Sequence, residues 1–410
     1  MPRKWNYGWV IVAVGVLVKM AALGFGRFTY PMLIPSMKLS LGLQYGEMGL
    51  LGGSILLGYL LFSFLGGALA TRFGSKRVVV IALLCSVGSM FGVSQSARFG
   101  LLLLFTFGLG AGAAGAHIAM TTLPMAWFDR RSLGRALGIV TGGTGVGVIA
   151  AGLLVPLFLL DSRGEGWRTC WRLLGFATFG VAMTAAVLLK ERPGNKDRGR
   201  VSQRGEKELP APKAKDGKLS LRVIIPAYFV FGIAYHIYAT YFVAFMVEDL
   251  RVVEKTAGLI WSFFGWTSIA SGLIWGYLSD QAGRRGALLF NIALISLAVL
   301  LPLCHHALFT LGLSSVLFGL TFLGTVTIVA AAVGDQATGK EATIYGLVTL
   351  VHGLGQFLGT ILGGYLKDIT GSFTLTLLVS EAGFLFCLFL FSLGPTLSSL
   401  WDRGKKKEGV

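Results

Sequence analysis

The feature that most constrains this chain is a series of twelve apolar runs, each long enough to cross a lipid bilayer. A transmembrane helix needs roughly 20 apolar residues. The runs lie at approximately 8–34, 47–70, 78–96, 99–126, 135–160, 168–189, 223–247, 256–278, 287–304, 307–333, 343–366 and 373–394. Charged residues make up only 13% of the 410 residues, about half the fraction in a typical soluble domain. We therefore expect an all-α membrane protein with twelve transmembrane helices, and not a soluble enzyme.

Lysine and arginine are distributed unevenly between the two sets of connecting segments. The set that contains the N-terminus, the segments at 71–77 and 190–222 and the C-terminal tail holds 26 of them, and the opposite set holds 8. Cytoplasmic segments of membrane proteins carry the excess of these residues. We therefore expect a multi-pass protein of a bacterial inner (plasma) membrane with both termini in the cytoplasm. The net charge of +17 then needs no nucleic acid as a partner.

A long polar stretch divides the twelve runs into six and six. It covers 190–222 and holds 11 basic and 5 acidic residues. We expect an N-terminal six-helix half over 1–189, a basic cytoplasmic linker over 190–222, a C-terminal six-helix half over 223–394 and a basic cytoplasmic tail over 395–410. A solvated tether is the simpler interpretation of the linker, and contact with anionic lipid is the alternative.

Two sequence patterns occur once in each half at nearly the same offset. The Gly-Ile-Val-Thr pattern at 138–141 corresponds to Gly-Leu-Val-Thr at 346–349, at an offset of 208. The glycine- and arginine-containing segment 67–77 corresponds to 276–285, at an offset of 209. We therefore expect two six-helix repeats of the same topology. In transporters, such repeats place the substrate site at their interface.

These segments resemble the major facilitator superfamily of secondary transporters. Segments 67–77 and 276–285 resemble its signature loop, 127–138 is similar to the loop between its fourth and fifth helices, and 166–168 to the start of its sixth. The Gly-Phe-Gly-Arg-Phe-Thr-Tyr segment at 24–30 looks like a branch of poorly characterised bacterial members. The resemblance covers the whole chain and implies the major facilitator fold with alternating access.

The resemblance also implies a set of gating residues at the two signature loops. They are Gly67, Arg72, Gly74, Lys76, Arg77, Gly276, Asp280, Gly283, Arg284 and Arg285. The chain departs from the family at Thr71, where an acid is usual, although Asp280 keeps the acid in the second loop. The fifth run also lacks the Gly-Pro pair of the family's drug/proton antiporters, which argues against drug export.

Two cations lie inside the first run, Lys19 and Arg27. A charge at mid-membrane costs roughly 2.5–3.5 kcal/mol on insertion scales, so such a residue indicates function. The two are eight residues apart, or about 80° around an ideal helix, and one broad face can carry both. The alternative is that the long side chains extend to the membrane interface.

In the family resembled, the first, fourth, seventh and tenth helices line the substrate cavity. In this chain they carry cations, histidines and tyrosines but no buried carboxylate, and His352 and Gln356 share a face of the eleventh helix. Our substrate-binding candidates are Lys19, Arg27, His117, Tyr235, His236, Tyr238, His352 and Gln356. Ordinary core packing remains the alternative for the histidines and tyrosines.

Two residues are candidates for carrying a coupling proton, His352 and Glu381. An imidazole has an ordinary pKa of about 6.5, so it can bind and release a proton near neutral pH. Glu381 is the only carboxylate well inside a run, but the family places the twelfth helix at the periphery, which favours a structural role.

We expect a secondary active transporter of a small organic solute, working as a monomer. Cations without a cavity carboxylate favour an organic anion such as a carboxylate. The alternatives are an exporter of amphipathic or neutral compounds, of drug or sugar type, and a non-transporting membrane sensor. We expect no cofactor, because no ATP motif is present, and no metal site, because the four cysteines lie far apart.

Overall fold

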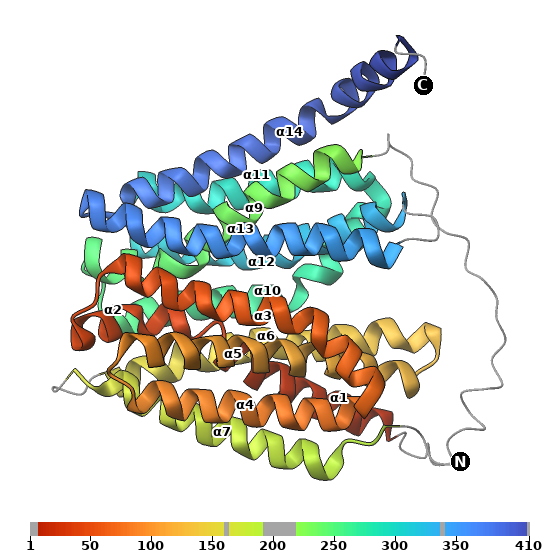
Figure 1. Cartoon of the computed structure of the whole chain (residues 1–410). Coiled ribbons are helices and arrows are strands. Elements are labelled where there is room, and N and C mark those ends of the chain that lie inside the picture. Colours follow the sequence, from red (N-terminus) through yellow and green to blue (C-terminus); the bar gives the residue numbers. More distant parts are fainter. Residues whose placement is uncertain (1–6, 160–163, 192–218, 337–340, 408–410) are drawn as a thin grey trace.

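The chain folds into a bundle of long helices (Figure 1). The computed structural model describes residues 7–159, 164–191, 219–336 and 341–407. The helices are α1 (Gly8–Lys19), η1 (Met20–Phe25), α2 (Tyr30–Leu41), α3 (Tyr45–Phe73), α4 (Ser75–Gln95), α5 (Phe99–Thr122), η2 (Leu123–Ala126), α6 (Arg130–Leu159), α7 (Gly166–Leu188), α9 (Leu221–Ala244), η3 (Phe245–Asp249), α10 (Glu254–Ala282), α11 (Arg284–Cys304), α12 (Leu308–Gly334), α13 (Glu341–Thr370) and α14 (Phe373–Lys407). Among the described residues, 12 helical spans are long and apolar enough to cross a membrane. The predicted all-α, twelve-helix membrane fold is confirmed.

Both ends of the chain lie at the same end of the bundle. In Figure 1, α1 begins and α14 ends on the right, and α2 lies on the left. We call the right-hand end, where α1 begins, the terminal end, and the opposite end the distal end. Most of the predicted linker (192–218) lies outside the described residues. The predicted tail starts as part of α14, which continues to Lys407.

The first span is broken, and the straight helix expected over 8–34 is wrong. α1 ends at Lys19, a π-helical segment follows to Phe25, and α2 begins at Tyr30 after a turn. Pro31 has no N–H to continue a hydrogen-bond ladder from the preceding turn. The Thr29 hydroxyl donates to the carbonyl of Gly24 at 3.1 Å, which stabilises the turn. Because the wider π turn changes the angular register, the angle expected from an ideal helix does not describe the two cations.

The two halves repeat in their packing as well as in sequence. A Cβ atom on Gly147 of α6 would lie 2.7 Å from the Cα of Gly24, and one on Gly355 of α13 would lie 3.3 Å from the Cα of Gly232 in α9. Gly24 and Gly147 correspond to Gly232 and Gly355, respectively, at an offset of 208. Such glycine contacts let helices approach closely in lipid, where apolar side chains give little preference for helix contact over lipid contact.

Two glycines of the signature loops have the same uncommon backbone conformation. Gly74 has φ of 89° and Gly283 has φ of 83°, a region that a side chain would make costly. Each ends a long helix and starts the next within one residue. These two positions, 209 residues apart, explain why the sequence keeps a glycine at this point in both halves.

The halves meet along two helix pairs, α6 with α10 and α3 with α13. A Cβ atom on Gly152 would lie 2.7 Å from the carbonyl oxygen of Gly258, and one on Gly258 would lie 2.5 Å from that of Gly152. At the other pair, a Cβ atom on Gly49 would lie 2.7 Å from the carbonyl oxygen of Thr360. Gly152 and Thr360 are 208 residues apart and Gly49 and Gly258 are 209 apart, so the repeat extends to the contact between the halves.

We predict that Gly110→Ala destabilises the N-terminal half, whereas Gly88→Ala does not. A Cβ atom on Gly110 would lie 1.8 Å from the backbone oxygen of Ile55, which cannot move without shifting α3. Overpacking of this kind costs about 1–3 kcal/mol. Gly88 in α4 has nothing within 4 Å of its Cβ position, so alanine there should gain about 0.5–1 kcal/mol of helix propensity. The measurement is the apparent melting temperature in detergent, and equal values for the two variants would contradict the packing described.

Candidate functional site

A cavity of about 220 Å³ lies between the two halves. Its lining comes from the end of η1 and from α3, α5, α6, α9, α12 and α13. It extends from Arg27 to Tyr345, which lies one turn from the start of α13. Since α13 starts at the terminal end, the cavity occupies the terminal side of Arg27. None of the described residues that line it carries a carboxylate.

Arg27 lies at the inner limit of this cavity, where the first span is broken. Its Nη2 donates to Oε1 of Gln356 at 2.7 Å, and Gln356 belongs to α13 of the other half. The guanidinium carbon lies 4.8 Å from the centre of the Tyr59 ring, a cation–π distance. The Nε of Arg27 is buried and has no hydrogen-bond partner among the described residues. Within the same residues, Arg27 makes no ion pair.

Gln356 connects Arg27 to His352. The amide nitrogen Nε2 of Gln356 lies 2.7 Å from Nε2 of His352. The Nδ1 of His352 lies 3.2 Å from the carbonyl oxygen of Tyr228 in α9, and the His352 and Tyr228 rings stack with centroids 4.1 Å apart. His352 and Gln356, which the sequence places four residues apart on one helix face, therefore belong to a chain of polar contacts. This chain crosses from one half to the other.

Two further polar atoms near Arg27 are buried and have no hydrogen-bond partner within the part of the chain that the structure describes, the hydroxyl of Tyr235 and Nδ1 of His236. Tyr235 lines the main cavity, and its ring stacks on Phe318 and Phe322 of α12. His236 lines a second, small cavity of about 20 Å³ on the distal side of Arg27. Unpaired buried polar groups are costly, which makes these two atoms candidates to bond a solute.

Lys19 does not line the cavity. It is 1% exposed, and its Nζ contacts Nδ1 of His117 at 2.8 Å, the His117 carbonyl at 3.1 Å and the Thr121 hydroxyl at 2.9 Å. Its charge therefore stays within the N-terminal half, whereas Arg27 reaches the other half. His117 lines the cavity, so Lys19 contacts a residue of the cavity wall without lining the cavity itself.

Tyr238 and Glu381 also lie outside the cavity lining. The Tyr238 hydroxyl bonds to the Ser314 hydroxyl at 2.5 Å, which places the side chain in the packing between α9 and α12. Glu381 of α14 accepts a hydrogen bond from Ser296 of α11 at 2.5 Å. These contacts support a structural position for both residues.

Several cavity residues are absent from our sequence-based candidates. They are Tyr59 and Ser63 of α3, Thr141 and Thr144 of α6, and Tyr345 and Thr349 of α13. They come from the second, fifth and eleventh spans, whereas the family resemblance points mainly to the first, fourth, seventh and tenth helices. The available signal was the repetition of hydroxyl groups on one face of a helix. Threonine and tyrosine are too common in such spans for this signal to single out binding residues.

The second signature loop forms an ion network at the terminal end. Arg284 contacts Asp280 at 2.5 Å and Asp335, which follows α12, at 2.9 Å. Arg285 donates to the carbonyl oxygens of Phe391 and Ser392 in α14. Gly276 lies in α10 beside Thr327 of α12. All of these contacts lie within the C-terminal half.

The first signature loop is held differently, because Thr71 supplies no charge. The Thr71 hydroxyl donates to the carbonyl of Gly67 in its own helix. The Glu191 carboxylate, which follows α7, instead accepts the backbone N–H of Ser75 at 3.1 Å and of Lys76 at 2.7 Å at the start of α4. A carboxylate at a helix N-terminus is favourable. The side chains of Arg72 and Arg77 are exposed at this end.

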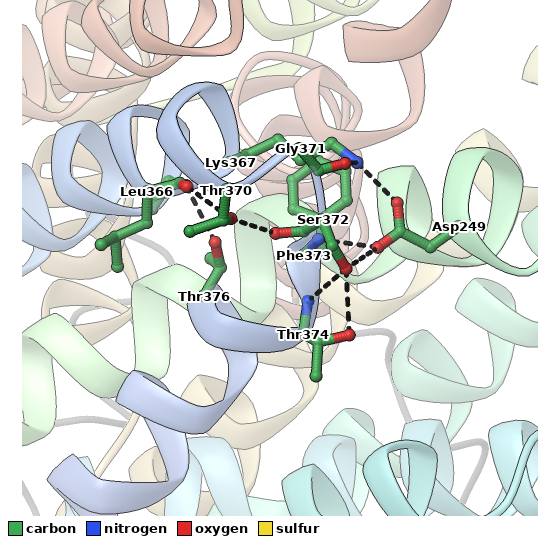
Figure 2. A network of polar contacts seen from close by, with 10 residues as sticks. Asp249, Leu366, Lys367, Thr370, Gly371, Ser372, Phe373, Thr374 and Thr376 are labelled. Atoms are coloured by element: carbon green, nitrogen blue, oxygen red, sulfur yellow. Dashed lines mark hydrogen bonds and ion pairs between the residues drawn. The ribbon is translucent and has the colours of Figure 1, made fainter.

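At the distal end, a carboxylate joins the two halves. Asp368 near the end of α13 accepts the N–H of Tyr45 at 2.9 Å and of Gly46 at 2.6 Å, at the first turn of α3. Beside it, Asp249 accepts from Lys367 at 2.6 Å, from the Ser372 hydroxyl at 2.8 Å and from the N–H of Phe373 at 2.7 Å (Figure 2). The contacts of Asp368 therefore join the two halves at the distal end.

A family model described as "Uncharacterised MFS-type transporter YbfB" matches residues 19–392. The chain belongs to this family. It is 24% identical over 380 residues to the hexuronate transporter of Bacillus subtilis (strain 168), with 83% of each chain covered. It is 24% identical over 391 residues to the probable sulfoacetate transporter SauU of Cupriavidus necator, with 90% of each chain covered.

Among solved structures, the fold resembles that of another transporter of the same architecture. It is a bacterial homologue of the human lysosomal transporter Spinster in an inward-facing, unoccupied conformation. The TM-score is 0.77 at 16% sequence identity, and the match covers 95% of this chain and 97% of that chain. The MFS-type membership and the fold agree with the major facilitator resemblance of the sequence, and the protein is a multi-pass membrane protein of a transporter family.

We predict that Asp368→Asn shifts the protein toward a state open at the distal end, whereas Asp249→Asn does not. Both carboxylates make strong bonds, but those of Asp368 cross between the halves and those of Asp249 stay within one half. Loss of a charge at a helix N-terminus is worth roughly 1 kcal/mol, or about a fivefold change in the ratio of two states.

The measurement is the distance distribution between spin labels at Leu39 of α2 and Phe309 of α12 in a cysteine-free background. Both side chains are 81% exposed. The population with the longer distance should rise in Asp368→Asn only. A similar rise in Asp249→Asn would show that general loosening of this end is sufficient and would overturn the specific role of Asp368.

Proposed function

We propose that this protein is a secondary active transporter that moves a small organic anion across a bacterial inner membrane by alternating access. The observation that carries the proposal is the position of Arg27 in the cavity. Its guanidinium lies at the inner limit of a cavity whose described lining carries no carboxylate, and its Nε–H has no hydrogen-bond partner among the described residues. A guanidinium keeps its charge at any accessible pH and binds a carboxylate through two parallel hydrogen bonds.

The surroundings of Arg27 support a carboxylate in this position. Gln356 satisfies one Nη2 N–H, and the Tyr59 ring covers one face of the guanidinium. Neither group neutralises the charge. An anion that enters from the terminal side would meet the guanidinium together with the His117 imidazole and the Tyr235 hydroxyl, which line the same cavity.

The relatives support the same class of solute. The printed solutes of the two relatives, hexuronate and sulfoacetate, are both organic anions that carry a carboxylate. Both relatives match along most of the chain, so the likeness includes both halves of the cavity. We propose the solute class and not an individual solute, because 24% identity leaves most cavity residues free to differ.

We further propose that the terminal end faces the cytoplasm. The excess of lysine and arginine at this end supports the orientation. The conformation described would then be closed toward the outside by Asp368, with the cavity extending toward the cytoplasm. Since one chain forms the whole cavity, we propose that the transporter works as a monomer.

We predict that Arg27→Lys weakens anion binding although it keeps the charge. An ammonium group cannot reproduce the paired N–H donors of a guanidinium. Loss of one charge-assisted hydrogen bond costs roughly 1.5–3 kcal/mol, or about 10- to 150-fold in affinity, and Arg27→Ala should cost more. The measurement is the affinity of purified protein for D-glucuronate, sulfoacetate and L-lactate, with D-glucose and choline as neutral and cationic comparisons.

Arg98→Lys is the matched control, because Arg98 is an exposed arginine at the start of α5, away from the cavity. Its affinities should equal those of the wild type. Equal affinities in the wild type and Arg27→Ala would refute the proposed grip on the anion. Preferred binding of D-glucose or choline would refute the anion class and favour the neutral or amphipathic alternative.

We predict that reporter fusions inserted within 195–215 and after the C-terminus both report the cytoplasm. The predicted linker and the tail carry 11 and 4 basic residues, and such segments are retained on the cytoplasmic side. The measurement is the activity of a paired cytoplasmic and periplasmic reporter at each site. A periplasmic signal at either site would require the opposite orientation of the cavity.

A further inference from the structure

We propose that His352 is a proton-binding site that controls the anion site, and that Gln356 passes the effect to Arg27. A proton on His352 would reverse the Gln356 amide and so free Arg27 for the anion. The transported unit would be one proton with one monovalent anion. This inference rests on the proposed function, and it adds the coupling ion and the residues that couple it.

The hydrogen bonds of His352 fix its protonation. The carbonyl oxygen of Tyr228 can only accept, so Nδ1 of His352, 3.2 Å away, must carry the hydrogen. The unprotonated Nε2 then accepts from the Nε2 amide group of Gln356 at 2.7 Å. The other end of this amide, Oε1, consequently faces Arg27 and accepts from its Nη2 at 2.7 Å. Each contact has one donor and one acceptor only if His352 is neutral.

The groups around His352 leave the added proton without a carboxylate partner. The titratable or charged groups that line the main cavity are Tyr228 and Tyr235 of α9, Tyr59 of α3, His117 of α5, Tyr345 of α13 itself, and Arg27. His236 of α9 lines the small cavity on the other side of Arg27. α12 contributes only apolar side chains to the lining. Among these described residues Arg27 is the fixed charge, and it has the same sign as a protonated imidazole. A proton on His352 therefore needs an anion in the cavity for charge compensation.

Protonation of His352 would break this chain of hydrogen bonds at one contact, the contact between His352 and Gln356. The proton would come from cavity water and bind Nε2 of His352, which then becomes a donor. Because the Gln356 Nε2 group is also a donor, the amide would rotate by half a turn and present Oε1 to His352. Its Nε2 would then face Nη2 of Arg27, where two donors meet. The proton is supplied by a hydronium ion of the cavity water: its O–H bond breaks, the N–H bond on His352 forms, and neutral water is left.

This rearrangement creates the anion site. Arg27 would lose its acceptor at Nη2 while Nε already lacks one. A carboxylate could then accept from both guanidinium nitrogens and from the reversed Gln356 amide. The proton and the anion each make binding of the other more favourable, and by the same factor. Without them, the Arg27–Gln356 bond satisfies one N–H of Arg27 in the empty carrier and joins the two halves.

The first test needs no anion. In protein labelled with ¹⁵N-histidine and reconstituted in nanodiscs, the His352 signals are identified by their loss in His352→Gln. At pH 8 we expect the tautomer with hydrogen on Nδ1. The tautomer with hydrogen on Nε2 would overturn the inference, because Gln356 would then present Oε1 to His352 and could not accept from Arg27.

The second test uses L-lactate and D-glucuronate, both monovalent, in liposomes that contain a pH-sensitive dye. For the wild type we expect one proton to enter per anion, no effect of membrane potential, and affinity that falls about tenfold per pH unit above the pH range in which His352 binds its proton. His352→Gln and Gln356→Leu should bind anion with an affinity independent of pH and move no proton with it. His306→Gln changes an exposed histidine before α12 and should match the wild type.

The outcomes separate the two proposals. Anion transport with the wild-type proton ratio in both His352→Gln and Gln356→Leu would overturn the proton site and leave the anion transporter intact. Anion uptake that charges the membrane would also overturn it. If neither anion binds the wild type, the proposed function fails for this class of solute, and the tautomer of His352 decides alone whether the chain of bonds exists as described.

Discussion

The structure depends on how one permanent cation is kept in a membrane-spanning bundle. A charge at this depth costs roughly 2.5–3.5 kcal/mol on insertion scales, and Arg27 has no ion-pair partner among the described residues. The π-helical segment and the turn after it place Arg27 at the boundary between the halves. There, Tyr59 of one half covers the guanidinium and Gln356 of the other accepts from it. The charge of Arg27 is therefore only partly compensated within the protein. This leaves the guanidinium able to bind a solute, because a full ion pair with an acidic side chain would already occupy it.

The internal repeat supplies the packing, and the departures from it supply the chemistry. Glycines at equivalent positions form the same close contacts in both halves. The polar residues of the site do not repeat: at an offset of 208, Arg27 corresponds to Tyr235 and Thr144 to His352, and at 209, Lys19 corresponds to Tyr228. The cations thus belong to the N-terminal half, whereas most of the imidazole and phenol groups that line the cavity belong to the C-terminal half. A symmetric scaffold therefore encloses an asymmetric site, as a solute with one charged end requires.

The sequence was sufficient for the fold and for part of the site. Apolar runs and matching offsets depend on local composition, so they predicted the spans, the repeats and the interface position of the cavity. The break in the first helix was missed, because the angle between Lys19 and Arg27 was computed for an ideal helix. The contact of Arg27 with Gln356 joins residues 329 positions apart, and no local pattern encodes such a pairing. The same limit applies to the first signature loop, where Glu191 lies 116 residues from Ser75. An acid missing from a motif can be replaced from elsewhere in the fold, so the departure at Thr71 alone did not reveal what holds that loop.

The distribution of polar contacts between the two ends restricts how the protein can move. At the terminal end, Arg284 and Glu191 bond within their own halves. At the distal end, Asp368 bonds across the halves, and near the middle Arg27 does the same. Each half can therefore move as a unit if only the crossing contacts change. A solute can shift such an equilibrium only by binding the two states with different affinity, and a change from 1:99 to 99:1 needs about 5.5 kcal/mol of difference. Among the described residues, the bond between Arg27 and Gln356 is a polar contact that crosses the halves and lines the cavity, so replacing it is a direct way for binding to act on the relation between the halves.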